Sequence, residues 1–339
     1  MAIPGTTPDP GLHHPGLHHP AMLHPSVPGR RSLGVRHAAP SDDLRRVPIG
    51  RGGFAHPAFW LAAACLTVAI VARVPLTRPS ATVIATLLFV AGGMPHGAYD
   101  IALIARTAAI GRRPLALAVA GYVGVAAAML VLWSMLPLVA LILFLIVAAI
   151  HFGEDWTMLD EPLLKMAAGT AIIVAPAIGH PAEVGRLFAA MADGEGGVGV
   201  AHALLALAPV ALLVTGVGIA VAWRDGAREW AAAMAVAIAM LVVAPPVFGF
   251  ALFFVFLHSP RHLADARLRL PDLSPLRWLA IGAAMSAAAI AGWLVCAMSL
   301  PDAFTPDLTA QAFQLLGAVA VPHLIASRWI DRANERAAR

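Results

Sequence analysis

The sequence predicts an all-α membrane protein, a polytopic transmembrane helical bundle of about ten spans, or eight to ten if a segment is re-entrant. Of the 339 residues, 60% are hydrophobic and only 12% are charged, whereas a soluble domain carries about 25% charged residues. The mean hydropathy is +0.79. Lipid cannot hydrogen-bond to the backbone, so spans must be helices or closed barrels. The Ala, Leu, Val and Gly content of the apolar segments favours helices.

Residues 1–50 are predicted to form a disordered Pro/His-rich tail. The pentapeptide GLHHP occurs twice in tandem, at Gly11–Pro15 and Gly16–Pro20, and the tail holds six of the 14 histidines. Polar, Pro-rich sequence cannot bury a core, which favours disorder. Weak capture of metal ions by these histidines is the alternative interpretation.

Ten apolar segments follow the tail, each close to the length of about 20 residues that a helix needs to cross a bilayer. They are residues 57–73, 80–104, 114–133, 135–152, 163–180, 199–222, 229–245, 247–263, 277–299 and 309–327. The third and fourth are separated only by a break near Met135 and Pro137. We expect a transmembrane domain over residues 55–330 and a cytoplasmic tail over residues 331–339.

The distribution of basic residues predicts that the N- and C-termini are both cytoplasmic, in a multi-pass protein of the cell (inner) membrane. Cytoplasmic loops are rich in Lys and Arg. On one side this topology places Arg30, Arg31, Arg36, Arg45, Arg46, Arg51, Arg106, Arg112, Arg113, Lys165, Arg224, Arg228, Arg261, Arg267, Arg269, Arg277, Arg328, Arg332, Arg336 and Arg339. The opposite loops hold only Arg73, Arg78 and Arg186. Because the arginines lie beside spans, the pI of about 9.8 does not indicate a nucleic-acid partner.

Histidines near the cytoplasmic ends of several spans predict a shared metal site. His258 and His262 are four residues apart, which places both on one helix face. In the predicted topology they lie within about 15 Å of the cytoplasmic side, as do His96, His151 and His323, at 1.5 Å of rise per residue. Histidine is costly in a span and rarely lies there without a role. Imidazole suits iron, copper or zinc, and an all-histidine set without cysteine argues against structural zinc.

Carboxylates follow these histidines at helical spacing, three or four residues further along the chain. They are Asp100, Glu154, Asp155 and Asp265. Hydrogen bonds from the outer ring nitrogens to such carboxylates would orient the imidazoles and offset the charge of a metal ion. For Glu154 and Asp155, a solvated loop is the alternative interpretation.

The segment around His96 is predicted to bend. Pro95 lacks a backbone donor, and Gly92, Gly93 and Gly97 around it permit unusual backbone angles. A kink here would turn His96 inward. Close packing of helices through small residues is the alternative role for the glycines.

Four short motifs, taken together, resemble the Brp/Blh family of bacterial and archaeal membrane-bound β-carotene 15,15′-dioxygenases. They are Gly93–Asp100 (GMPHGAYD), His151–Gly153 (HFG), His258–Leu263 (HSPRHL) and the dipeptide Pro322-His323. Their order and wide separation also resemble the family. The likeness covers roughly residues 55–330. One departure is Ile101, where members often carry a further histidine, and this puts the surroundings of His96 in doubt.

The resemblance implies that the domain is catalytic and cleaves the central double bond of β-carotene with O₂, giving two molecules of all-trans-retinal. It implies Fe(2+) held by His96, His151, His258 and His262, and it leaves the role of His323 open. It also implies a substrate dissolved in the lipid bilayer and a functional link to a retinal-binding opsin.

Three other functions remain open at this point. A membrane di-iron desaturase or hydroxylase would need several HxxxH and HxxHH clusters, whereas the chain has one HxxxH pair outside the tail. A His-lined metal or solute transporter would use the same histidines as a transit path and often contains inverted repeats, which the sequence does not visibly have. A non-catalytic helper of opsin assembly would be expected to have a degenerate histidine set.

Overall fold

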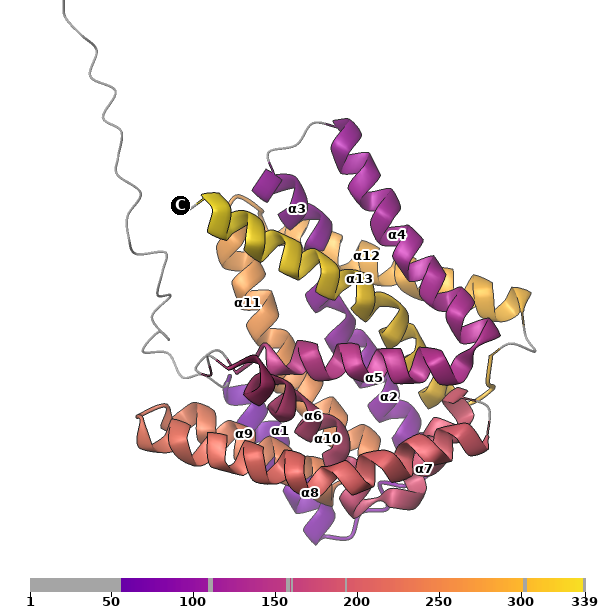
Figure 1. The fold of residues 1–339 in the computed structure, drawn as a ribbon, viewed down its shortest axis with the longest axis vertical. Helices are drawn as coiled ribbons and strands as arrows, with labels where there is room; N and C mark the ends of the chain where they lie inside the picture. Colours follow the sequence, from indigo (N-terminus) through magenta and orange to yellow (C-terminus); the bar gives the residue numbers. More distant parts are fainter. Residues whose placement is uncertain are drawn as a thin grey trace, which may run out of the picture. The chain divides into compact units, whose positions relative to one another are not determined.

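All regular elements of the described residues are helical, which confirms the predicted all-α class (Figure 1). The structure is a computed structural model that describes residues 56–108, 112–156, 159, 161–192, 194–300 and 304–337. The predicted disordered tail over residues 1–50 lies outside the described residues.

The elements follow one another along the chain with short connections. They are α1 (Pro57–Val71), α2 (Pro79–Gly93), the 3₁₀ turn η2 (Met94–Gly97), α3 (Asp100–Ala108), α4 (Arg112–Met135), α5 (Pro137–Gly153), α6 (Pro162–Gly179), α7 (Pro181–Ala192), α8 (Glu195–Arg224), α9 (Arg228–Val243), α10 (Pro246–Phe253), the π turn η3 (Phe254–His258), α11 (Ser259–Arg269), α12 (Pro275–Ser299) and α13 (Leu308–Ala337). Every predicted apolar segment contains a helix. The break near Met135 and Pro137 separates α4 from α5, as predicted.

Seven stretches of the described chain are long and apolar enough to cross a membrane. They are Pro79–Thr107, Arg113–Met135, Pro162–Gly179, Glu195–Arg224, Pro246–Arg269, Pro275–Ser299 and Leu308–Asn334. The apolar helices α1 and α5 are shorter, at 15 and 17 residues, and α9 has 16 residues. The number of ten spans and the side of each terminus therefore stay predictions. Helix α13 continues to Ala337, beyond the predicted boundary at residue 330.

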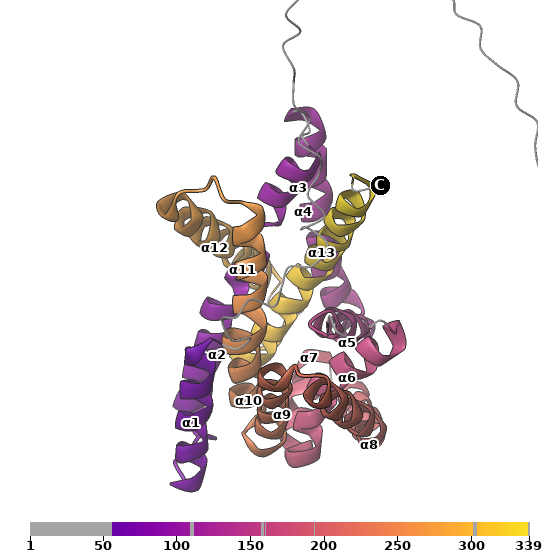
Figure 2. The same cartoon turned by 90° about the vertical axis from the view of Figure 1, so that its left-hand side faces the viewer.

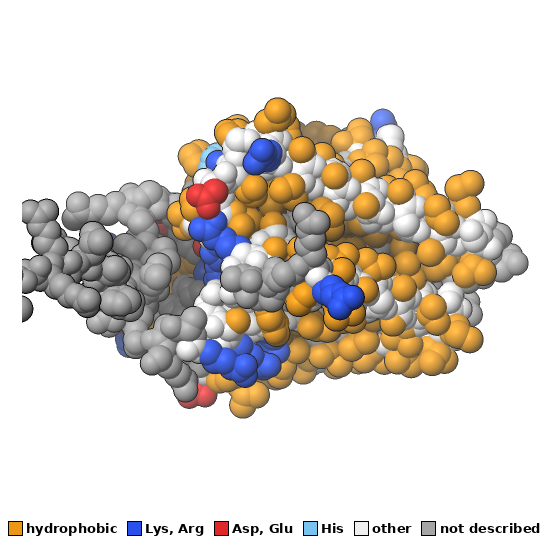
Figure 3. Space-filling view, turned by 90° about the horizontal axis from the view of Figure 1, so that it is seen from above, with side chains coloured by type: hydrophobic (Ala, Val, Ile, Leu, Met, Phe, Trp, Pro, Cys, Tyr) orange, Lys and Arg blue, Asp and Glu red, His pale blue; other side chains and the backbone are white. Residues whose placement is uncertain are grey.

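The surface of the helices is apolar. Large hydrophobic side chains are exposed along several of them, among them Leu117, Leu213 and Met298 at 74%, 70% and 80%. Hydrophobic side chains dominate the face in Figure 3, with few charged groups between them. Soluble proteins rarely expose apolar patches of this extent. Together with the seven long apolar helices, this surface indicates a membrane protein.

Small residues allow close contact between helices α5, α6 and α8, which pack on one another. A Cβ atom added to Gly169 of α6 would overlap the carbonyl oxygen of Ala149 of α5. A Cβ atom added to Gly153 would meet the backbone of Lys165 in the same way. In membranes, such close approach is the main source of helix–helix attraction.

Two of the long apolar stretches are interrupted, and the interruptions lie against each other. Helix α2 ends at Gly93 and η2 follows it, which confirms the predicted interruption at Pro95. The second stretch changes from α10 to the π turn η3, which ends at His258; π turns are frequent at functional sites. A Cβ atom on Gly93 would overlap the ring of Phe254, so the glycines also serve close packing.

Helix α13 brings the last part of the chain against helices from its first half. It packs against α3, α4 and α5, and it runs beside α4 in both cartoon views (Figures 1 and 2). Residues from α3, α4, α5 and α13 can therefore meet although they are far apart in the sequence. Asp100 of α3 and His323 of α13, for example, are more than 200 positions apart and are joined by a hydrogen bond.

The contact between α5 and α6 gives a stability prediction. In Gly169→Ala, the new methyl group meets backbone that cannot move aside, and overpacking costs about 1–3 kcal/mol. We expect the thermal midpoint of the detergent-solubilised protein to fall. The matched control is Gly124→Ala in α4, where nothing lies within 4 Å; alanine is favoured over glycine in a helix by about 1 kcal/mol, so its midpoint should hold or rise. Equal midpoints for the two variants would contradict the packing described for Gly169.

Candidate metal centre

Five imidazole rings converge in the described part of the chain. His96 comes from η2, His151 from α5, His258 from η3, His262 from α11 and His323 from α13. In nine of the ten pairs, the distance between ring centroids lies between 4.4 Å, for His258 and His262, and 6.2 Å, for His262 and His323. Four of the rings are buried, and the side chain of His262 is 23% exposed. The five histidines singled out in the sequence thus lie together, and their role as metal ligands stays a prediction.

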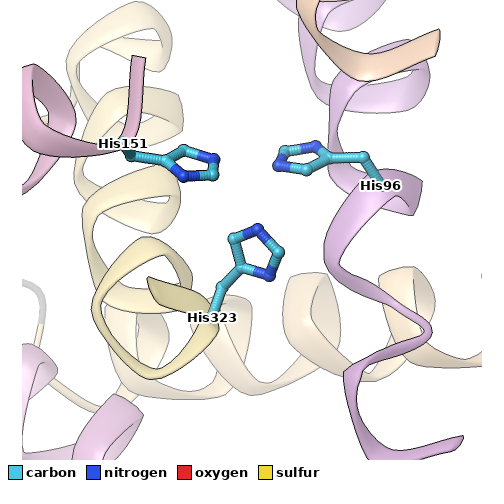
Figure 4. A group of neighbouring side chains, drawn as sticks. All are labelled: His96, His151 and His323. Carbon is cyan, nitrogen blue, oxygen red and sulfur yellow. The ribbon is translucent and has the colours of Figure 1, made fainter. Parts of the chain in front are cut away.

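The ring nitrogens form two overlapping groups in which a metal ion could be held. One group is His96, His151 and His323, and the other is His151, His258 and His262; within each, the ligand atoms lie within 4.8 Å of one another. In Figure 4, the rings of His96 and His151 point toward each other, and His323 points into the space between them. His323 therefore belongs to the cluster by geometry, whereas the sequence left its role open.

Four of the five rings make a hydrogen bond through Nδ1, on the side away from the cluster. The acceptors are the Gly93 carbonyl for His96, Glu154 for His151 at 3.2 Å, Asp155 for His258 at 2.8 Å and Asp100 for His323 at 2.8 Å. A carbonyl or a carboxylate can only accept, so Nδ1 carries the proton in each ring. In a neutral imidazole this leaves the lone pair on Nε2, the atom available to a metal ion.

The Nε2 atoms have no donor to satisfy them. Those of His151 and His258 are 3.2 Å apart, and with both Nδ1 atoms protonated there is no hydrogen between them. The Nε2 atom of His323 is buried without a hydrogen-bond partner, and that of His262 is buried 3.4 Å from the Asp155 carboxylate without a hydrogen bond to it. Buried acceptors without partners are costly. A cation at this point would satisfy them, so the residues fit a bound metal ion.

Arginines outside the cluster support two of the carboxylates. Arg328 donates to Glu154 at 3.2 Å, and Arg261 donates to the Asp155 carbonyl and lies 3.9 Å from its carboxylate. Burial by itself raises the pKa of Glu154, but the hydrogen bond with His151 and the contact with Arg328 hold the pKa below its ordinary value. Glu154 thus stays ionised beside His151, which makes it a good acceptor.

Of the carboxylates predicted to accompany the histidines, Asp100, Glu154 and Asp155 contact a histidine of the cluster and Asp265 does not. Asp100 is buried and bonded to His323, and Asp155 is buried and bonded to His258. Asp265 is exposed and makes no ion pair with a described histidine. Asp155 instead lies 3.4 Å from the Nε2 atom of His262. The expected partner of His262 is therefore replaced by a residue from another part of the chain.

Sequence reasoning missed Tyr122 of α4, which donates to Asp100 at 3.0 Å. The sequence also did not reveal that Arg328 donates to Glu154. The only local signal for Tyr122 is that the chain has just two tyrosines. Two further histidines at predicted spans, His180 and His202, do not join the cluster: His180 pairs with Glu183 and His202 is exposed.

An apolar pocket that is partly open to the outside adjoins the cluster. His96, His151 and His323 line it together with Tyr122. The remaining lining is largely apolar and includes Phe144, Phe152, Phe254, Met285, Leu316 and Val319. Such a pocket suits a hydrophobic ligand. Its polar lining consists of the three imidazoles and the hydroxyl-bearing residues Tyr122 and Ser286.

Comparison with known proteins agrees with this geometry. Residues 87–331, more than half of the chain, match the family model described as beta-carotene 15,15′-dioxygenase. The chain belongs to the β-carotene 15,15′-dioxygenase family. Members of this family are carotenoid-cleaving dioxygenases, so the chain is an enzyme of that class. The five histidines and the pocket all lie within the matched residues.

Two curated relatives share this family. The chain is 26% identical over 257 residues to the beta-carotene 15,15′-dioxygenase of uncultured marine bacterium 66A03, covering 71% of this chain and 91% of the relative. It is 27% identical over 308 residues to the probable beta-carotene 15,15′-dioxygenase Blh of Halobacterium salinarum, covering 77% and 86%. No solved structure matches the chain.

The two aspartates near His262 provide a matched test of the centre. In Asp155→Asn, the amide is a weaker acceptor for His258, and loss of such a partner typically weakens metal binding by about 10- to 100-fold. We expect this loss in a metal titration of the purified protein. Asp265→Asn removes a carboxylate close in sequence but exposed, and should bind metal like the wild type. Weaker metal binding in Asp265→Asn, with wild-type binding in Asp155→Asn, would instead support Asp265 as the partner of His262.

Proposed function

We propose that the protein cleaves the central double bond of β-carotene with O₂ and releases two molecules of all-trans-retinal, using Fe(2+) held by His96, His151, His258 and His262. The observation that carries this proposal is the cluster of five imidazoles beside an apolar pocket. Membership of the dioxygenase family supports the reaction class.

The substrate follows from the relatives and the pocket. Both curated relatives are named for β-carotene, a long hydrocarbon that dissolves in the bilayer. Phe144, Phe152 and Phe254 offer the polyene aromatic contacts without a polar group that would need a partner. Because the surface around the helices is apolar, the substrate can reach the pocket from lipid without crossing water.

The choice of iron rests on the donor set and the reaction class. Neutral imidazoles suit iron and leave positions open on the ion when only four are used. An iron ion held there would supply the redox chemistry with O₂. The reaction balances without another reductant, since one carbon–carbon double bond is broken and each oxygen atom of O₂ ends in one of the two aldehydes.

The protein's own residues prepare the centre for this chemistry. Asp155 and Glu154 hold His258 and His151 with their Nε2 atoms toward the shared space. Burial of the rings excludes water, which would otherwise compete for the same positions. Asp100 holds His323 in the same way, through a hydrogen bond from its Nδ1 atom.

We further propose a domain range, a membrane topology and a cellular location for the enzyme. Residues 55–330 form the catalytic domain, with about ten spans and both termini in the cytoplasm of a cell whose inner membrane holds the enzyme. Retinal released into the bilayer would be available to a retinal-binding opsin. The family match gives no support to a desaturase or a transporter, which would need different histidine sets or internal repeats.

Expression in cells that make β-carotene tests the proposal. We expect the cells to lose their orange colour and to accumulate all-trans-retinal, measured by chromatography of extracted pigments. A matched culture expressing His258→Ala should stay coloured, because this ring contributes to the metal group. Unchanged β-carotene, with the wild-type protein demonstrated in the membrane, would refute the substrate assignment.

A further inference from the structure

Resting on the proposed function, we infer that Tyr122 is a positioning residue of the metal centre: through Asp100 it fixes His323 as an additional nitrogen donor to the ion. Tyr122 lies on α4, Asp100 begins α3 and His323 lies on α13. The three side chains form one continuous hydrogen-bonded chain that runs from outside the cluster to its interior.

The geometry of this chain determines which atom carries each proton. The Tyr122 hydroxyl donates to Oδ2 of Asp100 at 3.0 Å. Both carboxylate oxygens of Asp100 accept from Nδ1 of His323, at 3.0 and 2.8 Å. Since Nδ1 must then hold the proton, Nε2 of His323 presents its lone pair to the cluster, where it is buried without a partner.

The two other carboxylates of the centre also have a donor group on their outer side, and Glu154 accepts a hydrogen bond from it. Glu154 holds His151 and accepts from Arg328, and Asp155 holds His258 and lies beside Arg261. Tyr122 occupies the equivalent position for Asp100. A neutral donor suits this place, because Tyr122 and Asp100 both lie within long apolar stretches, where an additional arginine would be costly.

Close packing leaves the His323 ring little freedom. A Cβ atom on Gly97 would lie 3.3 Å from Nδ1 of His323, so the ring rests against the η2 backbone that also carries His96. The centroids of the His96 and His323 rings are 5.1 Å apart. Rotation of the Asp100 carboxylate is the remaining freedom in this chain, and the Tyr122 hydroxyl restrains it.

The second tyrosine of the chain provides a matched control. Tyr99 is buried and Tyr122 is half-buried, and the Tyr99 hydroxyl also donates at 3.0 Å, but to the backbone carbonyl of Trp278. Its ring stacks on that of Trp278, and it does not line the pocket beside the cluster. Tyr99→Phe and Tyr122→Phe therefore each remove one hydroxyl that donates a hydrogen bond, and only the second removes a donor to Asp100.

The experiment is a measurement of iron affinity by chelator competition on the purified full-length protein. We expect Tyr122→Phe to bind iron about 10- to 100-fold more weakly than the wild type, the usual effect of losing an outer partner of a metal ligand. Tyr99→Phe should match the wild type. In a double-mutant cycle, Tyr122→Phe should have no further effect in an Asp100→Asn background, because the two residues act through one hydrogen bond.

The outcomes separate this inference from the proposed function. Wild-type protein that binds no iron would refute the proposed function. Iron affinity in Tyr122→Phe equal to that of Tyr99→Phe, or effects of Tyr122→Phe and Asp100→Asn that add in full, would overturn the inference while leaving the function intact. Should Tyr122→Phe fail to accumulate in the membrane, Asp100→Asn alone tests the link, and unchanged iron affinity there would also overturn it.

Discussion

The pairing of each inward-facing imidazole with an acceptor on its outer side is the interaction on which the rest of the site depends. The rings are taken out of water, and a buried polar group without a partner is costly. The Gly93 carbonyl, Glu154, Asp155 and Asp100 each accept from one Nδ1 atom. In these four rings the proton is therefore on the outer nitrogen, and their Nε2 lone pairs are left to converge. The fold supplies a set of neutral nitrogen ligands that a cation would satisfy, and no cysteine belongs to the set.

This requirement explains the irregular helices around the centre. A regular α-helix through residues 79–107 would keep its backbone bonds within the helix; the break at η2 turns His96 inward and frees the Gly93 carbonyl to accept from its ring. The π turn η3 ends at His258 and changes the direction of the side chains before α11 begins. The two breaks pack on each other through Gly93 and Phe254. The deviations from regular helix thus lie where the cluster needs them.

The sequence predicted the local features of the site and one non-local feature, but not the individual contacts between distant residues. Apolar length gave the helices and the Pro95 motif gave the break, since both depend on neighbours in the chain. The histidines are far apart in the chain, and their gathering followed from the similar membrane depth that the topology gives them. The partner of His262 was expected at Asp265 by assuming one regular helix face, but Asp265 is exposed and Asp155, more than 100 residues earlier, takes that place. Tyr122 and Arg328 meet their carboxylates only through packing of α4 and α13, which no spacing in the sequence reveals.

The most direct test of a metal centre built from imidazoles is X-ray absorption spectroscopy at the iron edge of the purified, iron-loaded protein. Several histidines around one ion give a nitrogen first shell with the multiple-scattering pattern of imidazole rings. The predicted spectrum shows that pattern with no sulfur in the first shell, since Cys65 and Cys296 are free and lie outside the cluster. A first shell of oxygen alone, with no imidazole scattering, would contradict the assignment of the histidine cluster as the metal centre.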